Sequence, residues 1–250
     1  MKTNWDYTSL ADAYLKRPGY SAAAIDAALS VMGAVPGKSV CDVGAGVAHL
    51  TLMLAERGLR VTAVEPNDAM RANGLKRTGA FENVQWSEGT GECSGQADRA
   101  FDLVTFGSSF NVCDRGAAMV ETARILKPMG WFSCLWNHRD LEDPIQQTIE
   151  GIIRAKVDGY GYGTRREDQR AVIESSGLFG EVVHLDARIV HHQPIDECIE
   201  AWRSHATLQR QAGVHFSNVV AAIKDYLGNL GTSSIAVPYT TNVWIARLRT

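Results

Sequence analysis

The turn Asp42-Val43-Gly44-Ala45-Gly46 has the residue types in this sequence that are best suited to binding a ligand. It follows a short apolar run and precedes a stretch with apolar residues at helical spacing. Glycine lets a backbone bend tightly and approach a ligand closely, because it carries no Cβ atom. Two glycines between a strand and a helix also occur for steric reasons alone. The surrounding residues must therefore decide whether this turn binds a ligand.

A second acidic residue stands at the end of the next apolar run. Glu65 follows Gly44 by 21 positions, a spacing at which a carboxylate can accept hydrogen bonds from both ribose hydroxyls of an adenosine. The plain alternative is a solvated carboxylate at the end of a strand. Together with the glycine turn, Glu65 predicts a cofactor that contains adenosine, either a dinucleotide or S-adenosylmethionine.

The charge of Asp42 distinguishes these two cofactors. Asp42 would repel the pyrophosphate of a dinucleotide, whereas it complements the ammonium group of a methionine moiety. In addition, His49 takes the place of the third glycine that normally allows close helix packing around a pyrophosphate. The residues therefore favour a cationic cofactor, S-adenosylmethionine.

Several segments of the chain, in order, resemble the motifs of one enzyme family. The segment from Val40 to Asn67 resembles motifs I and II of class I S-adenosylmethionine-dependent methyltransferases. Residues 87–92 resemble the loop after the third strand that covers the adenine, and residues 101–106 resemble the fourth-strand motif. Near the N-terminus, residues 11–20 resemble the entry segment of small-molecule methyltransferases of the trans-aconitate and ubiquinone-biosynthesis kind.

The resemblance implies a set of cofactor-binding residues at strand ends and in the entry segment. The first turn would hold the methionine part, Glu65 the ribose, Met70 and the loop at residues 89–91 the adenine, and Gly107 and Ser108 the sulfonium. Core packing is the plain alternative for Met70. The implied residues are Tyr14, Arg17, Asp42, Gly44, Ala45, Gly46, Glu65, Pro66, Met70, Gly89, Thr90, Gly91, Gly107 and Ser108.

The acceptor side departs from the family pattern at one position. Related enzymes often carry a histidine just after the fourth strand, where this chain has Asn111. Asparagine cannot remove a proton near neutral pH, so a base must come from elsewhere or the acceptor must already be nucleophilic. His138, directly after the fifth predicted strand, is the preferred replacement as base or acceptor-orienting group, with a surface histidine as the plain alternative. Other candidates are Tyr160, Tyr162, His191, His192 and His205.

The elements that would position these residues alternate between strands and helices. Continuous apolar strands joined by helical crossovers predict a parallel sheet covered on both faces. We expect a doubly wound, Rossmann-like α/β fold with a seven-stranded, mostly parallel sheet, an N-terminal helical lid and insertions after strands 5 and 6. Strands are expected at 39–43, 59–64, 84–86, 101–106 and 131–136, and helices at 48–57, 68–76 and 116–126.

The flanking segments are expected to surround this core. Residues 8–33 predict one or two helices broken at Pro18-Gly19, and residues 195–229 predict two helical pieces. Further helices are expected at about 144–156 and 167–176, with strand-like residues at 180–192 and 234–248. Pro238 in the last strand suits an edge or a bulge. We expect a single domain over residues 1–250, with a lid at 1–37, a cofactor-binding core at 38–137 and substrate-side insertions at 138–250.

Composition narrows the classes of partner. The 250 residues carry a net charge of −3 and no dense run of lysine and arginine, so nucleic acid is not an expected partner. No run of about 18 apolar residues predicts a membrane span, and the first residues lack a signal-peptide pattern, so we expect a cytoplasmic protein. Five cysteines without a CxxC pair indicate buried, reduced thiols, and no spacing of ligands indicates a metal site.

The sequence therefore predicts a methyltransferase that uses S-adenosylmethionine to methylate an O, N or C atom of a small molecule, as a monomer or homodimer. The alternative is a module that binds S-adenosylmethionine without catalysis, as a sensor or scaffold. A nucleotide-dependent oxidoreductase is a third reading, which Asp42 and His49 oppose.

Overall fold

The computed structural model describes residues 7–249 and is built around a seven-stranded sheet with the order β3-β2-β1-β4-β5-β7-β6. The first five strands pair in parallel, and β7 runs antiparallel to both of its neighbours. This arrangement confirms the predicted doubly wound, mostly parallel sheet. The strands are β1 (Ser39–Val43), β2 (Arg60–Val64), β3 (Val84–Ser87), β4 (Phe101–Gly107), β5 (Leu126–Arg139), β6 (Phe179–Pro194) and β7 (Ser234–Leu248).

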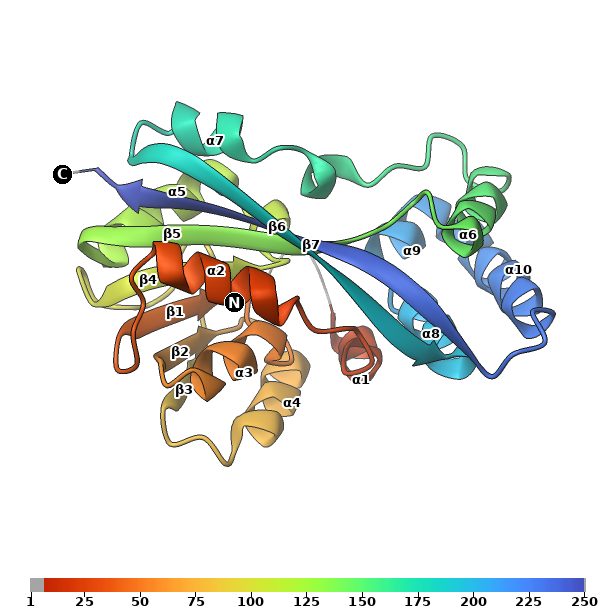
Figure 1. Cartoon of the computed structure of the whole chain (residues 1–250), viewed down its shortest axis with the longest axis horizontal. Helices are drawn as coiled ribbons and strands as arrows, with labels where there is room; N and C mark the ends of the chain where they lie inside the picture. The colour runs from red at the N-terminus through yellow and green to blue at the C-terminus, as the bar shows by residue number, and fades with distance from the viewer. Residues whose placement is uncertain (1–6, 250) are drawn as a thin grey trace.

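Helices cover both faces of the sheet (Figure 1). On one face, α2 (Ala22–Val31) and α3 (His49–Glu56) contribute to an apolar cluster that includes Val40 of β1. On the other face, α5 (Arg115–Ile125) and α7 (Arg170–Ser175) contribute to a cluster around Phe132 of β5. Burial of both faces explains why the central strands read as unbroken apolar runs rather than alternating ones.

Side-chain caps fix where several of the helices begin. The Ser21 hydroxyl accepts from the backbone of α2, Asn67 caps α4 (Asp68–Thr78), and Asp114 caps α5. Each such cap stabilises its helix by about 1 kcal/mol. Two of these caps follow sheet strands, so they also fix where the loops at the carboxyl edge of the sheet end.

A second group of elements extends beyond the parallel strands. We call it the helical lobe: α6 (Pro144–Arg154), the segment 155–166 that follows it, α8 (Ile195–Arg203), α9 (Ala206–Ala212), α10 (Phe216–Gly228) and the outer ends of β6 and β7. The lobe has an apolar cluster of its own around Ile149, Trp202 and Ile223. Strands β6 and β7 are long enough to belong to both the sheet and this lobe, as Figure 1 shows.

The last strand shows how Pro238 is accommodated. An edge or a bulge was expected there, and although β7 as a whole lies between β5 and β6, Pro238 itself pairs only with β6. The pairing of β5 with β7 ends at Arg139 opposite Tyr239, so Pro238 lies just past the ladder on that side. A residue without a backbone N–H is tolerated there because that flank has no strand to receive it.

The N-terminal segment crosses between the sheet and the helical lobe. It contains a short 3-10 turn (Thr8–Leu10), α1 (Ala11–Tyr14) and the Pro18-Gly19 break before α2. The Lys16 ammonium lies 2.8 Å from the Glu197 carboxylate of α8, and Arg17 donates to the Ser204 carbonyl at 2.7 Å. The segment thus contacts the lobe at two points.

The five cysteines are all free thiols, as expected, although their burial differs. Cys41, Cys134 and Cys198 are buried, Cys113 is partly buried, and Cys93 is exposed, which the apolar surroundings in the sequence did not indicate. None of the helices within residues 7–249 combines the length and the apolar character that crossing a membrane requires.

Candidate active site

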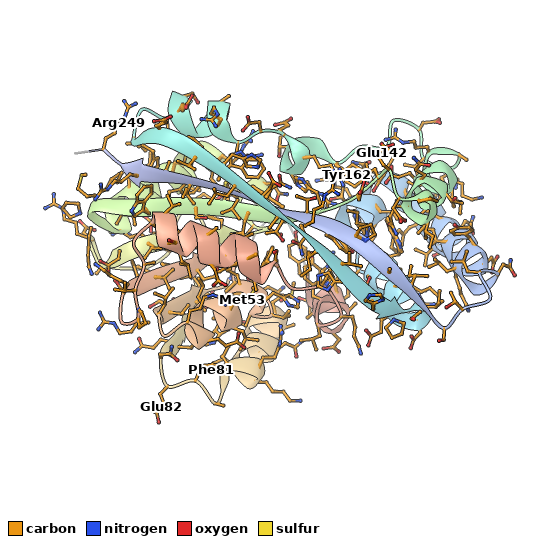
Figure 2. The ribbon with its side chains drawn as sticks, viewed as in Figure 1. Met53, Phe81, Glu82, Glu142, Tyr162 and Arg249 are labelled. Carbon is orange, nitrogen blue, oxygen red and sulfur yellow. The ribbon has the colours of Figure 1, made fainter. Side chains whose placement is uncertain are left out.

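A cavity of about 590 Å³ opens at the carboxyl ends of the parallel strands and reaches the helical lobe. Open α/β sheets place their ligand sites at this edge. The lining comes from the loops after β1, β2 and β4, from the N-terminal segment and from the lobe. Tyr162, labelled in Figure 2, belongs to the lobe side of the lining, whereas Asp42 and Glu65 belong to the strand side.

The glycine turn after β1 has the backbone conformation that its sequence predicts. Gly44 and Gly46 have φ angles of +68° and +57°, in the left-handed region that favours glycine. A Cβ atom on Gly44 would lie 2.5 Å from Ser109 Cβ, whereas one on Gly46 would meet nothing within 4 Å. Gly44 therefore allows close packing against the β4 loop, and Gly46 leaves space beside the cavity.

The Glu65 carboxylate links the end of β2 to this turn. One oxygen accepts the Gly46 N–H at 2.9 Å and the other accepts the Asn67 N–H at 2.9 Å. Glu65 is 6% exposed, and burial raises its pKa. A carboxylate oxygen accepts more than one hydrogen bond, so Glu65 can hold the turn and still accept from a ligand hydroxyl.

Asp42 provides a fully buried carboxylate beside the same turn. Its oxygens accept hydrogen bonds from the hydroxyls of Thr51 at 2.7 Å and Thr105 at 3.2 Å. Burial raises the pKa of Asp42 to about 6, against the effect of these two hydroxyls. A buried carboxylate without a cationic partner favours a positively charged ligand group, because such a group replaces the lost hydration of the anion.

Most of the residues that the family resemblance implied line this cavity. Gly89 lies outside the lining, because its Cα faces the Ser94 carbonyl and an added Cβ would lie 2.5 Å from that oxygen. Its role is to allow the loop after β3 to pack closely. The implied residues that do line the cavity are Tyr14, Arg17, Asp42, Gly44, Ala45, Gly46, Glu65, Pro66, Met70, Thr90, Gly91, Gly107 and Ser108.

The chemistry of this half of the cavity fits S-adenosylmethionine. Asp42 suits a cationic amino-acid part, Glu65 suits ribose hydroxyls, and the buried Met70 offers an apolar surface for a base. The space left open at Gly46 lies between these groups.

The N-terminal segment contacts this half at two points and is held together by one internal contact. The His49 ring donates from Nε2 to the Tyr14 carbonyl at 2.9 Å, and burial lowers the pKa of His49 to about 4, so the ring is neutral. Arg17 stacks over the Tyr14 ring at 3.7 Å. The Tyr20 hydroxyl lies 3.0 Å from Ser108 Oγ. Tyr20 is the last residue of the entry segment, and the resemblance assigned it no role. Its side chain nevertheless lines the cavity.

Asn111 lies where the resemblance suggested, on the cavity wall. Its Oδ1 accepts from the Trp136 indole at 2.9 Å, which fixes the amide. The Nδ2 group makes no hydrogen bond within residues 7–249 and remains available as a donor. Asn111 can therefore orient an acceptor but cannot deprotonate it.

His138 is not among the side chains that line the cavity. Its Nε2 lies 2.8 Å from the Arg165 carbonyl, and its Nδ1 lies 3.2 Å from Asn242 Nδ2. The carbonyl requires a hydrogen on Nε2 and the amide requires the lone pair on Nδ1. Burial lowers the pKa of His138 to about 4, consistent with this neutral ring. A catalytic role stays a prediction, and the contacts favour a positioning role instead.

The lobe side of the cavity contains residues that sequence reasoning missed. Arg139, Arg165 and Arg166 line it and were not singled out. Two further lining residues were considered: His205, as one of several histidine candidates, and Tyr239, for which core packing was expected. The adjacent pair Arg165-Arg166 beside the Gly/Tyr stretch was the available signal. Local pattern cannot place that stretch opposite Arg139, because the segments that carry Arg139, Arg165 and His205 meet only when the lobe folds.

Comparisons with known proteins agree with this geometry. Residues 41–134 match the family model described as a methyltransferase domain. An uncharacterized methyltransferase of Mycobacterium tuberculosis is 37% identical over 128 residues, which cover 50% of this chain and 48% of the relative. The demethylmenaquinone methyltransferase of Tropheryma whipplei is 29% identical over 130 residues, covering 52% and 50%. The chain spans about half the length of these curated relatives.

A solved structure extends the likeness of the fold to almost the whole chain. The YcgJ protein of Bacillus subtilis superposes with a TM-score of 0.57 at 18% identity, covering 92% of this chain and 100% of that one. At this identity the likeness concerns the fold alone. The sheet order and the glycine turn with its two buried carboxylates fit the family match over residues 41–134, and together they support a methyltransferase domain of the class I, S-adenosylmethionine-dependent kind.

Proposed function

We propose that this protein transfers a methyl group from S-adenosylmethionine to a small-molecule acceptor held between the sheet and the helical lobe. The observation that carries this proposal is the continuity of one cavity, from Asp42 and Glu65 at the strand ends to Arg165 and His205 in the lobe. Its size of about 590 Å³ falls within the usual range for small-molecule sites. A cofactor and an acceptor would each have a distinct chemical environment in it.

The chain's own residues would bind and orient rather than react. When bound, S-adenosylmethionine supplies an electrophilic methyl group on a positively charged sulfur. Asp42 complements cationic charge, Glu65 accepts from hydroxyl groups, and the Tyr20 hydroxyl and Ser108 close the wall at the end of β4. The segment from Tyr14 to Pro18 lies against the cavity and limits access of water. Holding two reactants at attack distance is the main contribution expected for such a transfer.

Three described residues of the cavity wall that could be considered as a base are poorly suited to removing a proton. Asn111 has no basic atom, and His205 uses its Nδ1 lone pair to accept the Leu208 N–H at 3.1 Å. The Tyr162 hydroxyl donates to Glu150 and has a raised pKa because of burial. The acceptor we propose is therefore one whose attacking atom is nucleophilic without a protein base, such as an ionised or readily ionised group.

The relatives leave the acceptor open. One curated relative is named for demethylmenaquinone, so a quinone ring carbon is one attacking atom that deserves testing. The alternative of a non-catalytic binding module remains the second candidate, since Asn111 stands where related enzymes carry histidine. The two candidates differ in one measurable outcome, the transfer of a methyl group.

The test is a methyl-transfer screen with S-adenosylmethionine carrying a radioactive methyl group. Acceptors of several classes, including quinones, phenols, amines and organic acids, are incubated with the wild-type chain and with Glu65→Ala. Transfer to at least one acceptor that depends on Glu65 supports the enzyme. Tight binding of S-adenosylhomocysteine with no transfer to any class would favour the non-catalytic module.

A further inference from the structure

Four arginines line the same cavity, and three of them lie on its lobe side. Arg17 comes from the N-terminal segment, Arg139 from the end of β5, and Arg165 and Arg166 from the 3-10 turn at Gly163–Arg166. The ion pairs formed among residues 7–249 involve none of the four. Positive charge is therefore gathered on the lobe side without an anion from the described chain to balance it.

The contacts of these guanidinium groups position them but do not neutralise them. Arg139 stacks over the Trp202 ring at 4.1 Å and donates to the Tyr239 hydroxyl at 3.1 Å. Arg166 donates to the Arg139 carbonyl at 2.6 Å, and its Nε is buried without an acceptor. A buried donor without an acceptor is costly and rare in folded proteins.

The buried carboxylate of Glu150 acts on the charge of Arg166 but forms no ion pair with it. One oxygen of Glu150 accepts from the Tyr162 hydroxyl, and the other, which has no hydrogen-bond donor among residues 7–249, lies 3.5 Å from Arg154 Nε on the same helix. Glu150 is not part of the cavity lining. Four carboxylates of the described chain do line the cavity: Asp42 and Glu65 lie at the strand ends that we assign to the cofactor, and Glu92 and Asp114 lie in the loops after β3 and β4.

The arginines also affect one another and a neighbouring histidine. Burial, together with the charges of Arg17 and Arg139, lowers the pKa of Arg165 to about 10. Burial and the same arginines lower the pKa of His205 well below its usual value. With Nδ1 accepting from the backbone of α9, the neutral His205 ring carries its hydrogen on Nε2. The lobe side thus has guanidinium and imidazole donors and a shortage of acceptors.

We propose that Arg139, Arg165 and Arg166, with His205, bind an anionic group of the methyl acceptor, a carboxylate or a phosphate. Planar guanidinium groups recognise both anions through paired N–H donors. Arg17 is left to the cofactor, because it packs on Tyr14 beside the strand ends. This inference rests on the proposed function, since it assigns the half of the cavity that the cofactor leaves free.

The experiment measures anion binding to the chain after saturation with S-adenosylhomocysteine. The probes are succinate, tricarballylate, inorganic phosphate and phenyl phosphate, with the uncharged succinamide as a control. Calorimetry gives the dissociation constants for the wild-type chain, Arg165→Gln and Arg203→Gln. Arg203 pairs with Glu200 on the surface of α8 and is the matched control for loss of one arginine.

We expect at least one anion to bind and Arg165→Gln to weaken it by about tenfold or more, with Arg203→Gln unchanged. S-adenosylhomocysteine affinity should stay within about twofold in both variants. Preference for the carboxylates or for the phosphates then identifies the anion. Arg165→Gln should keep or raise the thermal midpoint, because it removes one of several like charges; this readout confirms that the variant is folded.

Three results would overturn the inference. These are no anion binding to the loaded chain, equal anion binding by Arg165→Gln, and an equal loss of S-adenosylhomocysteine binding in that variant, which would assign Arg165 to the cofactor. Failure of the wild-type chain to bind S-adenosylhomocysteine at all would instead contradict the proposed function. The two failures are therefore distinguishable.

Discussion

At the scale of single residues, two buried carboxylates are the centre of the site. Asp42 and Glu65 stand at the ends of neighbouring parallel strands, and each is bound by groups of the turn or of the sheet. Burial raises the pKa of each. The free energy that this costs the folded chain would be recovered when a cationic ligand binds.

Asp42→Asn should therefore separate binding from stability. The variant should bind S-adenosylhomocysteine about 1.5 to 3 kcal/mol more weakly at pH 7.5, because it loses a charge-assisted contact with the ammonium group. Its thermal midpoint should be equal to or above that of the wild type, because a buried charge is removed. Calorimetry and thermal unfolding check the two parts. A variant that is less stable but binds normally would contradict the role of Asp42.

The raised pKa of Asp42 also predicts a dependence on pH. The folded, unliganded chain takes up a proton on Asp42 near pH 6, above the ordinary pKa of about 3.9. Affinity for the cofactor should fall as the pH drops through 6, because the protonated form no longer attracts a cation. The effect of Asp42 on stability has the opposite sign. Between about pH 4 and 6 the folded chain binds more protons than the unfolded chain, so the free energy of unfolding decreases as the pH rises through this range. A titration from pH 5 to 8 should show that Asp42→Asn flattens the affinity profile.

Glu65→Ala should weaken binding of S-adenosylhomocysteine by about 1 to 3 kcal/mol, through loss of hydrogen bonds to the ribose. It should also lower the thermal midpoint, because the Gly46 and Asn67 N–H groups lose their acceptor. Calorimetry on the folded variant measures the first effect. An unchanged dissociation constant would remove Glu65 from the cofactor site.

Variants of His138 test whether a histidine outside the cavity positions Arg165 on the cavity wall. Its Nε2–H holds the Arg165 carbonyl, so His138→Ala should raise the KM for the acceptor more than it lowers kcat. His138→Gln keeps a donor and should restore most of the KM. The measurement uses an acceptor found in the transfer screen. A hundredfold fall in kcat, with loss of one limb of its pH profile, would instead show that His138 is a base.

At the scale of elements, the predictable parts are those fixed by local pattern. The strand at Ser39–Val43 and the helix at Asp68–Thr78 were predictable from apolar runs, a capping Asn67 and the glycines that follow. The strand expected at 180–192 is also close to the observed β6. The length of β5 was not predictable: a strand was expected at 131–136, and the structure has one from Leu126 to Arg139.

The N-terminal segment is the element whose movement the cofactor should affect. It has surface contacts such as Lys16 with Glu197, which contribute less than about 1 kcal/mol, and it packs beside the Tyr14 side of the cavity. Hydrogen exchange at residues 11–20 should slow when S-adenosylhomocysteine binds, while exchange in α10 stays the same. Equal exchange in both states would contradict a lid.

At the scale of the whole molecule, the cavity has two halves, and only one of them was predictable from the sequence. The cofactor half was predictable, because a turn such as Gly44 to Gly46 needs particular residues at fixed local spacing. The acceptor half was not, because Arg139, Arg165 and His205 come from separate segments whose approach depends on the packing of the helical lobe. Local pattern carries no information on such distant pairs.

The most direct test of the central claim is a calorimetric titration with S-adenosylhomocysteine, with NAD titrated in parallel, on the wild-type chain and on Gly46→Val. We predict one-to-one binding of S-adenosylhomocysteine to the wild type, none to folded Gly46→Val, whose left-handed backbone resists a branched side chain, and none of NAD. Binding of NAD alone, or equal binding of S-adenosylhomocysteine by both chains, would contradict the account.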